Sequence, residues 1–251
     1  MDPKDRIAVV TGAAGGIGQS IVRELLRAGA TVHGLDRNAA AQLVLARELG
    51  ARYHAYTVDL ADRSASNRAH AQLLEALGGR CDILVNNVGV AGVVPFESSD
   101  DVLLDTTLAV NFVAAFRLTR ALLPALRASG HASVVNIASE LALIGQSGYS
   151  AYCASKGALL AWSRALAVEL AGEGIRVNAV CPGPIDTRLL AAEFASCADP
   201  GEARRAEIAT VPVGRLGVPK EVATVVGFLA GDSAAFVSGA AWSVDGGKTA
   251  R

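Results

Sequence analysis

Short apolar runs alternate with longer stretches of helical periodicity along the whole chain. The apolar runs have the length of buried strands, and they occupy residues 7–10, 31–35, 53–58, 83–85, 133–137 and 176–180. The first helical pattern ends at Ala28, and four others cover about residues 39–49, 64–77, 100–127 and 152–171. Alternation of this kind predicts a doubly wound parallel sheet with helices on both faces, an α/β fold of three layers and about seven strands.

Residues 184–212 break this alternation because they contain no strand pattern. We expect loops here, and an insert of this length in a compact fold is more often a lid than a spacer. The rest of the sequence contains no linker, repeat or low-complexity tract, and 251 residues suit one large α/β domain. The sequence therefore predicts a single domain over residues 1–251 with a lid at about 184–212.

Composition and charge argue against several classes of protein. The net charge is −1 and no basic stripe is present, which disfavours nucleic-acid binding. No segment offers the ~18 uninterrupted apolar residues of a membrane span, and the charged N-terminus lacks a signal-peptide pattern. The four cysteines and four histidines have no metal-ligand spacing, so we expect no metal site, free thiols and a cytoplasmic location.

Tyr152 and Lys156 stand four residues apart, so they share one face of the helix predicted there. The chain has 19 arginines and only 4 lysines, and Lys156 is the only lysine between Asp5 and Pro219. An ammonium group close to a phenol favours the phenolate and would lower the tyrosine pKa from its usual ~10. Such a phenol can exchange a proton with an alcohol oxygen. Taken alone, the pair is equally compatible with a solvated helix face.

The run Thr11-Gly12-Ala13-Ala14-Gly15-Gly16-Ile17-Gly18 follows the first strand and opens a helix. Glycines here permit a tight turn and a close approach of the backbone to a pyrophosphate, while the helix N-terminus offers free N–H groups. The spacing differs from the usual Gly-x-Gly-x-x-Gly fingerprint of dinucleotide-binding proteins. Its place between a strand and a helix nevertheless favours a nucleotide-binding turn.

Asp36 ends the second strand, where a carboxylate can accept hydrogen bonds from ribose hydroxyls. It would repel the 2′-phosphate of NADP, whose charge is roughly −1.5 to −2 by analogy with phosphorylated side chains. We therefore expect NAD, with NADP as the less favoured cofactor. The next residue, Arg37, could partly accommodate a phosphate.

Further landmarks follow the later strands in order: Asp59-Leu60, Asn86-Asn87-Val88-Gly89, Asn111 in the long helix, Ser139, and Pro182-Gly183-Pro184-Ile185-Asp186-Thr187. Together with the glycine turn and Tyr152/Lys156, they resemble the short-chain dehydrogenase/reductase family, in its branch of single-domain enzymes of ~250 residues. The resemblance covers essentially the whole chain. It implies a Rossmann-like fold and an oxidoreductase that interconverts a small-molecule secondary alcohol and its ketone.

The resemblance also implies roles for individual residues. Tyr152 would be the general acid/base, Ser139 would hold the substrate oxygen, Lys156 would lower the pKa of Tyr152 and bind the nicotinamide ribose, and Asn111 would hold a relay water. The implied cofactor contacts are Gly12, Gly15, Gly16, Ile17, Gly18, Asp36, Arg37, Asp59, Leu60, Asn87, Gly89, Tyr152, Lys156, Pro182, Gly183, Ile185 and Thr187. Val88 departs from the alanine usual in this family, and its side chain would crowd the cofactor cleft or fill a gap behind it.

Candidates for substrate contact are Glu140, Gln146 and Tyr149. Glu140 could equally cap a helix or meet a partner subunit, and Tyr149 is expected to be a pocket wall because no lysine follows it four residues later. Arginines in residues 184–212 would meet an acid group or only solvent. The resemblance implies a homotetramer. Two alternatives remain open: an NADP-dependent 3-oxoacyl-type reductase, and a dinucleotide-binding sensor without catalysis.

Overall fold

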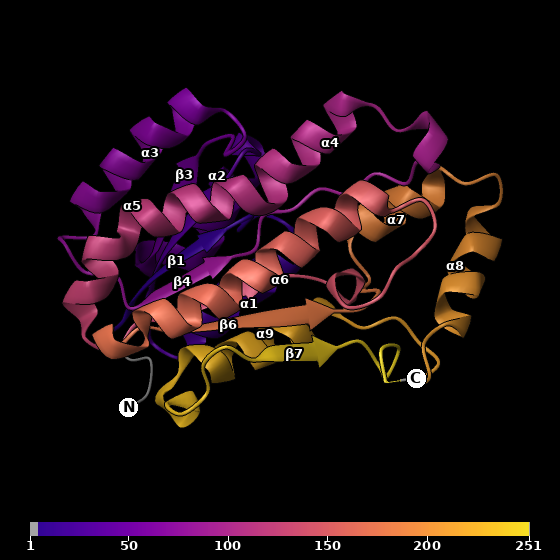
Figure 1. Ribbon diagram of the computed structural model, residues 1–251. Helices are drawn as coiled ribbons and strands as arrows, with labels where there is room; N and C mark the ends of the chain where they lie inside the picture. Colours follow the sequence, from indigo (N-terminus) through magenta and orange to yellow (C-terminus); the bar gives the residue numbers. More distant parts are fainter. Residues whose placement is uncertain (1–4, 251) are drawn as a thin grey trace.

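The computed structural model describes residues 5–250 as a parallel sheet of seven strands with helices on both faces (Figure 1). The strands run in the order β3-β2-β1-β4-β5-β6-β7, and every neighbouring pair is parallel. Their bounds are β1 Ile7–Thr11, β2 Thr31–Asp36, β3 Tyr53–Thr57, β4 Ile83–Asn86, β5 Ser133–Ile137, β6 Arg176–Pro182 and β7 Ala241–Val244. The prediction of a Rossmann-like α/β fold is confirmed.

The helices divide between the two faces of the sheet. Helices α1 (Gly16–Arg27), α2 (Ala39–Leu49) and α9 (Pro219–Ala230) share one core cluster with the sheet. Helices α3 (Arg63–Ala76), α5 (Ala114–Ser129) and α6 (Ser150–Leu170) share the other, and α5 and α6 run alongside each other across the sheet in Figure 1. The remaining helices, α4 (Asp101–Leu108), α7 (Arg188–Ala195) and α8 (Pro200–Ala209), lie towards the end of the sheet at which the strands finish.

The alternation of side chains along each strand explains the two clusters. In β1, Ala8 and Val10 pack with α1, whereas Val9 between them packs with α3 and α5. Successive residues of a strand point to opposite faces, so a sheet covered on both sides needs apolar residues at nearly every position. This requirement is why the strands could be recognised in the sequence as continuous apolar runs.

The strand order reverses between β1 and β4, because the chain moves outwards through β2 and β3 and then returns to the other side of β1. In open α/β sheets, ligands bind in the crevice beyond the carboxyl ends of the strands at this switch point. The segments that follow β1, β4, β5 and β6 therefore meet at one edge of the molecule.

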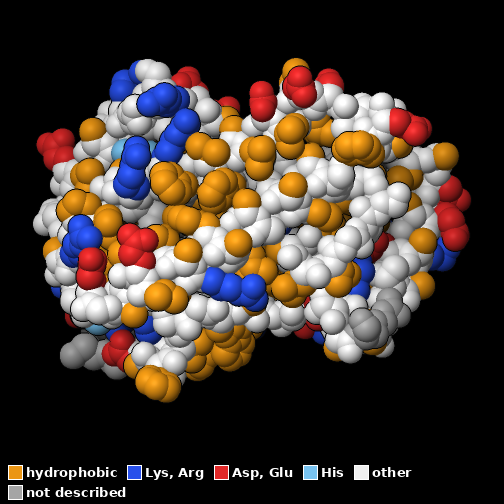
Figure 2. Space-filling view, in the orientation of Figure 1, with side chains coloured by type: hydrophobic (Ala, Val, Ile, Leu, Met, Phe, Trp, Pro, Cys, Tyr) orange, Lys and Arg blue, Asp and Glu red, His pale blue; other side chains and the backbone are white. Residues whose placement is uncertain are grey.

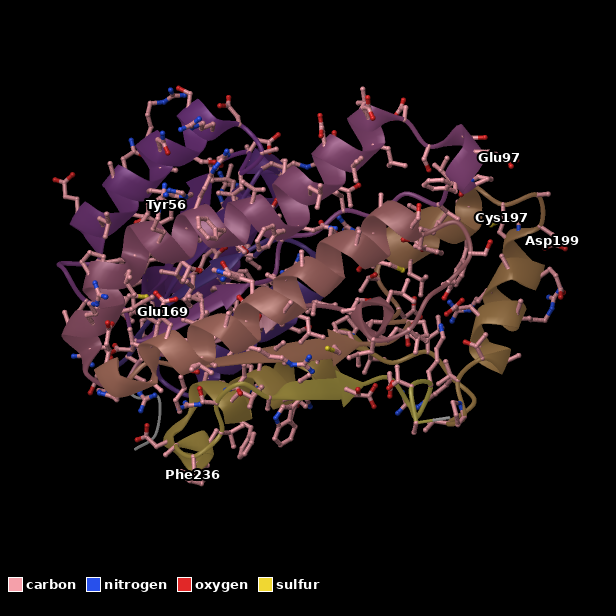
Figure 3. All side chains as sticks on the ribbon, viewed as in Figure 1. Tyr56, Glu97, Glu169, Cys197, Asp199 and Phe236 are labelled. Carbon is pink, nitrogen blue, oxygen red and sulfur yellow. The ribbon has the colours of Figure 1, made fainter. Side chains whose placement is uncertain are left out.

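Three elements differ from the sequence prediction. The long helix of residues 100–127 is interrupted by a π-helical turn at Ala109–Val113, and the last strand, β7, had not been located. Most of residues 184–212 is helical rather than loop, because Thr187 caps α7 and Asp199 caps α8. Figure 3 labels Cys197 and Asp199 in the turn between these two helices, at the edge of the molecule.

One helical stretch, Asp101–Ser129, is long and apolar enough by length and composition to cross a bilayer, with a mean hydropathy of 1.4. Core helices of globular proteins pass the same test. Here the stretch comprises α4, the π turn and α5, and it packs on the sheet through the fully buried Leu118, Leu122 and Leu126.

Candidate active site

Two neighbouring cavities open beyond the carboxyl ends of the strands. The first, of about 850 Å³, is lined by Ser139, Tyr152 and Lys156, and we call it the tyrosine cavity. The second, of about 970 Å³, is lined by the glycine turn and Asp36, and we call it the glycine cavity. Five lining residues are common to both: Ile17, Asn87, Gly89, Thr187 and Leu189. The two cavities are therefore parts of one continuous groove.

The glycine turn has the geometry of an anion cradle. Helix α1 begins at Gly16, with no side-chain cap and no acidic residue in its first turn, so its first N–H groups remain available for a ligand. Gly12 has a φ of +63°, a backbone conformation that favours glycine. A Cβ on Gly18 would lie 1.9 Å from the Gly12 carbonyl oxygen. Side chains at these positions would block the turn, and the glycines and free N–H groups fit a diphosphate.

The Asp36 carboxylate is fixed at the end of β2, in the wall of the glycine cavity. Its Oδ2 accepts a hydrogen bond from the Ala14 amide at 3.0 Å, and its Oδ1 accepts one from the Asn38 amide at 2.9 Å. Arg37 lines the same cavity but is exposed. The carboxylate thus holds a defined position, whereas the guanidinium lies at the solvent side.

Asn87 and Thr11 join the end of β4 to the glycine turn. The Asn87 side-chain amide donates to the carbonyl oxygens of Thr11 and Gly12 at 2.9 and 3.1 Å. The Thr11 hydroxyl accepts from the backbone amides of Asn87 and Val88 at 2.9 and 3.0 Å. Sequence reasoning had not given Thr11 this role. The Val88 side chain packs against the core cluster on the α5 face, which matches the gap-filling alternative, although Val88 also contributes to the cavity lining.

Tyr152 and Lys156 lie on the same side of α6, as their spacing predicted. The Lys156 Nζ is 5.8 Å from the centroid of the Tyr152 ring, and both residues line the tyrosine cavity. Lys156 is buried, and its Nζ donates to the carbonyl oxygen of Ile137 at 2.8 Å. Ser139 comes two residues after the end of β5 and forms a side-chain hydrogen bond with Tyr152. Helix α6 and the segment after β5 thus bring a phenol, an ammonium group and a hydroxyl together.

The expectation that Lys156 lowers the pKa of Tyr152 is wrong for the ligand-free protein. Burial raises the pKa of Tyr152 to about 12, the hydrogen bond with Ser139 lowers it, and the nearby carboxylates of Glu193 and Glu140 raise it. Burial also lowers the pKa of Lys156 to about 8. Loss of hydration is the largest cause of both shifts, and the ammonium group is bonded to the Ile137 carbonyl oxygen rather than to the phenol.

Asn111 lies in the π-helical turn, a feature frequent at functional sites. Its Oδ1 accepts from the Val90 amide at 2.8 Å, and its Nδ2 donates to the Val90 carbonyl and to the Ser155 hydroxyl, both at 2.9 Å. A Cβ on Gly89 would lie 3.3 Å from the Lys156 Nζ and 3.5 Å from the Asn111 Oδ1. Asn111 is buried and absent from the lining of both cavities, so it lies near Lys156 but outside the groove.

The remaining residues predicted to contact the cofactor line the same two cavities. Asp59 and Leu60 line the glycine cavity, and Pro182, Gly183 and Ile185 line the tyrosine cavity. Thr187 contributes to both, and a Cβ on Gly16 would lie 3.2 Å from its methyl carbon. The segment after β6 therefore closes on the glycine turn.

The lining of the tyrosine cavity also includes the three predicted substrate residues, Glu140, Gln146 and Tyr149. It also contains Glu193 from α7 and Glu207 from α8, which sequence reasoning had missed. A third missed residue is Lys248, whose Nζ donates to Glu140 and Glu207 at 2.9 and 2.7 Å. The only sequence signal for it was the rarity of lysine in this chain.

Comparison with known proteins agrees with this geometry. The family model described as enoyl-(acyl carrier protein) reductase matches residues 12–249. The chain is 35% identical to 2-(S)-hydroxypropyl-CoM dehydrogenase 3 of Xanthobacter autotrophicus, over 98% of each chain. It is 37% identical to D-threitol dehydrogenase of Mycolicibacterium smegmatis, over 97% of this chain and 93% of the relative.

A solved structure gives the same result in three dimensions. A putative NAD(P)-dependent gluconate 5-dehydrogenase from Beutenbergia cavernae, with NADP bound at low occupancy, superposes with a TM-score of 0.90. The two sequences are 37% identical, and the match covers 99% of this chain and 98% of the other. Fold, site geometry and relatives agree that the chain belongs to the short-chain dehydrogenase/reductase family and is an oxidoreductase acting on CH–OH groups.

Proposed function

We propose that the protein is an NAD-preferring oxidoreductase that interconverts a secondary alcohol and its ketone, with Tyr152 as the general acid/base. One observation supports this most strongly: Ser139, Tyr152 and Lys156 line a cavity that continues directly into the glycine-lined cavity. A proton-transfer group and an anion cradle are thus joined in one groove.

The residues of this groove fit a nicotinamide dinucleotide. The free N–H groups of α1 would hold the diphosphate, Asp36 the adenosine ribose, and Lys156 the nicotinamide ribose. When bound, the nicotinamide supplies the hydride chemistry that no side chain can perform. The fixed carboxylate of Asp36 supports NAD over NADP, whereas the NADP of the Beutenbergia protein supports the opposite preference, with Arg37 as the partner of the phosphate.

In alcohol oxidation, the Tyr152 phenolate would take the hydroxyl proton while the Ser139 hydroxyl donates to the same oxygen. In ketone reduction, the neutral phenol would return that proton. The raised pKa of Tyr152 keeps the phenol neutral near pH 7, which is the form that reduction requires. Lys156 would stabilise the phenolate when it forms, and Asn111 would hold a water that connects the lysine to solvent.

The proposal extends to the assembly of subunits, to a lid over the site and to the cellular location of the protein. Apolar side chains gather over α4, α5 and α6 on the face seen in Figure 2, and Phe116 and Val168 are exposed there. An apolar surface of this kind is typical of an interface between subunits, so we infer a homotetramer.

Residues 184–212 would act as the lid, since Leu189, Leu190 and Glu193 of this segment line the tyrosine cavity. All four cysteines are free, which supports a cytoplasmic location.

The NADP-dependent 3-oxoacyl-type reductase remains the alternative, because the matching family model is described as an acyl-carrier-protein reductase. It would require preference for NADP and a basic surface for an acidic carrier protein. The net charge of −1 and the position of Asp36 disfavour it.

The test is an absorbance screen at 340 nm with NAD and NADP over sugars, cyclic alcohols, hydroxy acids, steroids and 3-oxoacyl thioesters. We expect oxidation of a secondary alcohol with NAD, and slower oxidation when deuterium replaces hydrogen on the carbinol carbon. Binding of NAD without turnover of any compound would contradict the proposal and support a dinucleotide sensor.

A further inference from the structure

Three carboxylates from three separate elements face the tyrosine cavity. Glu140 comes from the turn after β5, Glu193 from α7 and Glu207 from α8. Among the residues from 5 to 250 that line this cavity, Lys156 is the only cation, and its Nζ is engaged with the Ile137 carbonyl. The wall that would meet a substrate is therefore anionic.

Glu193 is connected to the proposed acid/base through Tyr149. The Tyr149 hydroxyl donates to its Oε2 at 2.8 Å, and the Tyr149 ring packs edge-on against the Tyr152 ring at a centroid distance of 6.1 Å. The charge of Glu193 also raises the pKa of Tyr152. The carboxylate is held by one hydrogen bond, and its second oxygen, Oε1, has acceptor capacity left for a ligand.

Glu140 and Glu207 share a single counter-ion, Lys248. Its ammonium group reaches the site from the C-terminal segment and bonds one oxygen of each carboxylate. The segment is held by Asp245, which accepts from the amides of Gly247 and Thr249 at 3.0 and 2.9 Å. Glu140 is 4% exposed, and its Oε2 has no hydrogen-bond partner within the described part of the chain. One cation for two carboxylates leaves this corner acidic.

The arginines of residues 184–212 do not offset this charge. Arg204 pairs with Asp186 at 3.4 Å and Arg205 pairs with Glu202 at 2.7 Å, and neither lines the tyrosine cavity. Arg188 lines the glycine cavity instead. The segment thus directs two carboxylates, Glu193 and Glu207, into the tyrosine cavity and its guanidinium groups elsewhere.

Given the proposed function, on which this inference rests, we infer that the substrate is an uncharged polyol, with Glu193 accepting a hydrogen bond from a hydroxyl next to the reacting carbinol. A carboxylate, sulfonate or phosphate on the substrate would be repelled by the wall, and like-charge contacts of this kind give specificity. Hydroxyl groups donate to carboxylates without adding charge. An ammonium group on the substrate is disfavoured because it would be repelled by Lys156 in the same cavity, and because Lys248 already supplies a cation to Glu140 and Glu207.

Matched substrates test this inference with the full-length enzyme and NAD. One series is propane-1,2-diol, lactate and 1-aminopropan-2-ol; a longer one is threitol, threonate and 1-amino-1-deoxythreitol. Within each series the carbon skeleton is the same, and only the group at C1 and its charge differ. We expect kcat/KM for the neutral compound to exceed that for the acid at least about 100-fold. A hydroxy acid or an amino alcohol as the best substrate would overturn the inference and leave the proposed function intact, whereas absence of turnover in every class would count against both.

Two variants assign the effect to Glu193. Glu193→Gln retains an acceptor for the Tyr149 hydroxyl but removes the charge, and it should reduce the ratio of kcat/KM between threitol and threonate at least about tenfold. Glu202→Gln, on the exposed side of α8, should leave this ratio unchanged. If Glu193→Gln unfolds the protein, Glu207→Gln tests the same wall. An unchanged ratio in folded Glu193→Gln and Glu207→Gln would overturn the inference.

Discussion

Replacement of Asp36 by asparagine should weaken the discrimination between NAD and NADP. The carboxylate is fixed by two backbone amides at 2.9 and 3.0 Å, so it cannot turn away from a 2′-phosphate. Asp36 is partly exposed, and an effective dielectric constant of about 40–80 applies. At a separation of about 5 Å, charges of −1 and about −2 then repel by roughly 2–3 kcal/mol, or roughly 30- to 150-fold.

The assay measures kcat/KM for NAD and NADP with one alcohol, at low and moderate ionic strength. Asp36→Asn and Asp36→Ala should both raise the relative use of NADP by about the factor given above. Arg37→Ala should lower the use of NADP, because it removes the cation that directly follows Asp36 in the cavity lining. Since salt screens partly exposed charges, the wild-type preference should fall as ionic strength rises. If the cofactor ratio is unchanged in Asp36→Asn, repulsion by this carboxylate does not set the preference.

Three further predictions concern the walls of the groove. Gly18→Ala places a Cβ 1.9 Å from the Gly12 carbonyl oxygen and should lower Tm by several degrees. At Gly15 the nearest atom to an added Cβ is 3.3 Å away, so Gly15→Ala should change Tm by no more than about 2 °C. Equal changes in Tm by calorimetry would contradict the close packing described for the glycine turn. Lys156→Met should lower kcat/KM at least about 100-fold and raise Tm, because a desolvated ammonium group is replaced by an apolar side chain; a lower Tm would be inconsistent with this reasoning. Burial raises the pKa of Glu140 to about 6, so its contribution to stability is present below pH 4.5 and is lost as pH rises through 6. Urea titrations of wild type and Glu140→Gln should therefore diverge by about 2 kcal/mol between these pH values, and parallel curves would refute the shift.

Much of the fold could be predicted because a sheet buried on both faces leaves a plain signal. Five of the six predicted strands are found within about one residue of their expected ends, and β6 continues two residues further to Pro182. β7 was missed because Ala241–Val244 is a short strand at the edge of the sheet, half exposed, without a continuous apolar run. The π turn at Ala109–Val113 interrupts a periodic pattern that a regular helix would also satisfy.

The site could be predicted where residues act through local spacing. The glycine turn and the Tyr152/Lys156 pair depend on neighbours within one or two helical turns. Lys248 lies 108 residues from Glu140, so no local pattern could reveal that ion pair. The pKa of Tyr152 was expected in the wrong direction, because spacing gives the distance between two groups but not how deeply the fold buries them.

The most direct test of the account compares two tyrosines in one cavity. Tyr152→Phe removes the proposed acid/base, whereas Tyr149→Phe removes a hydroxyl that is bonded to Glu193. Both variants should bind NAD as the wild type does, measured by quenching of protein fluorescence. We predict that Tyr152→Phe lowers kcat at least about 1,000-fold at every pH, while Tyr149→Phe retains at least about a tenth of the wild-type rate. Turnover near the wild-type rate in Tyr152→Phe would contradict the central claim.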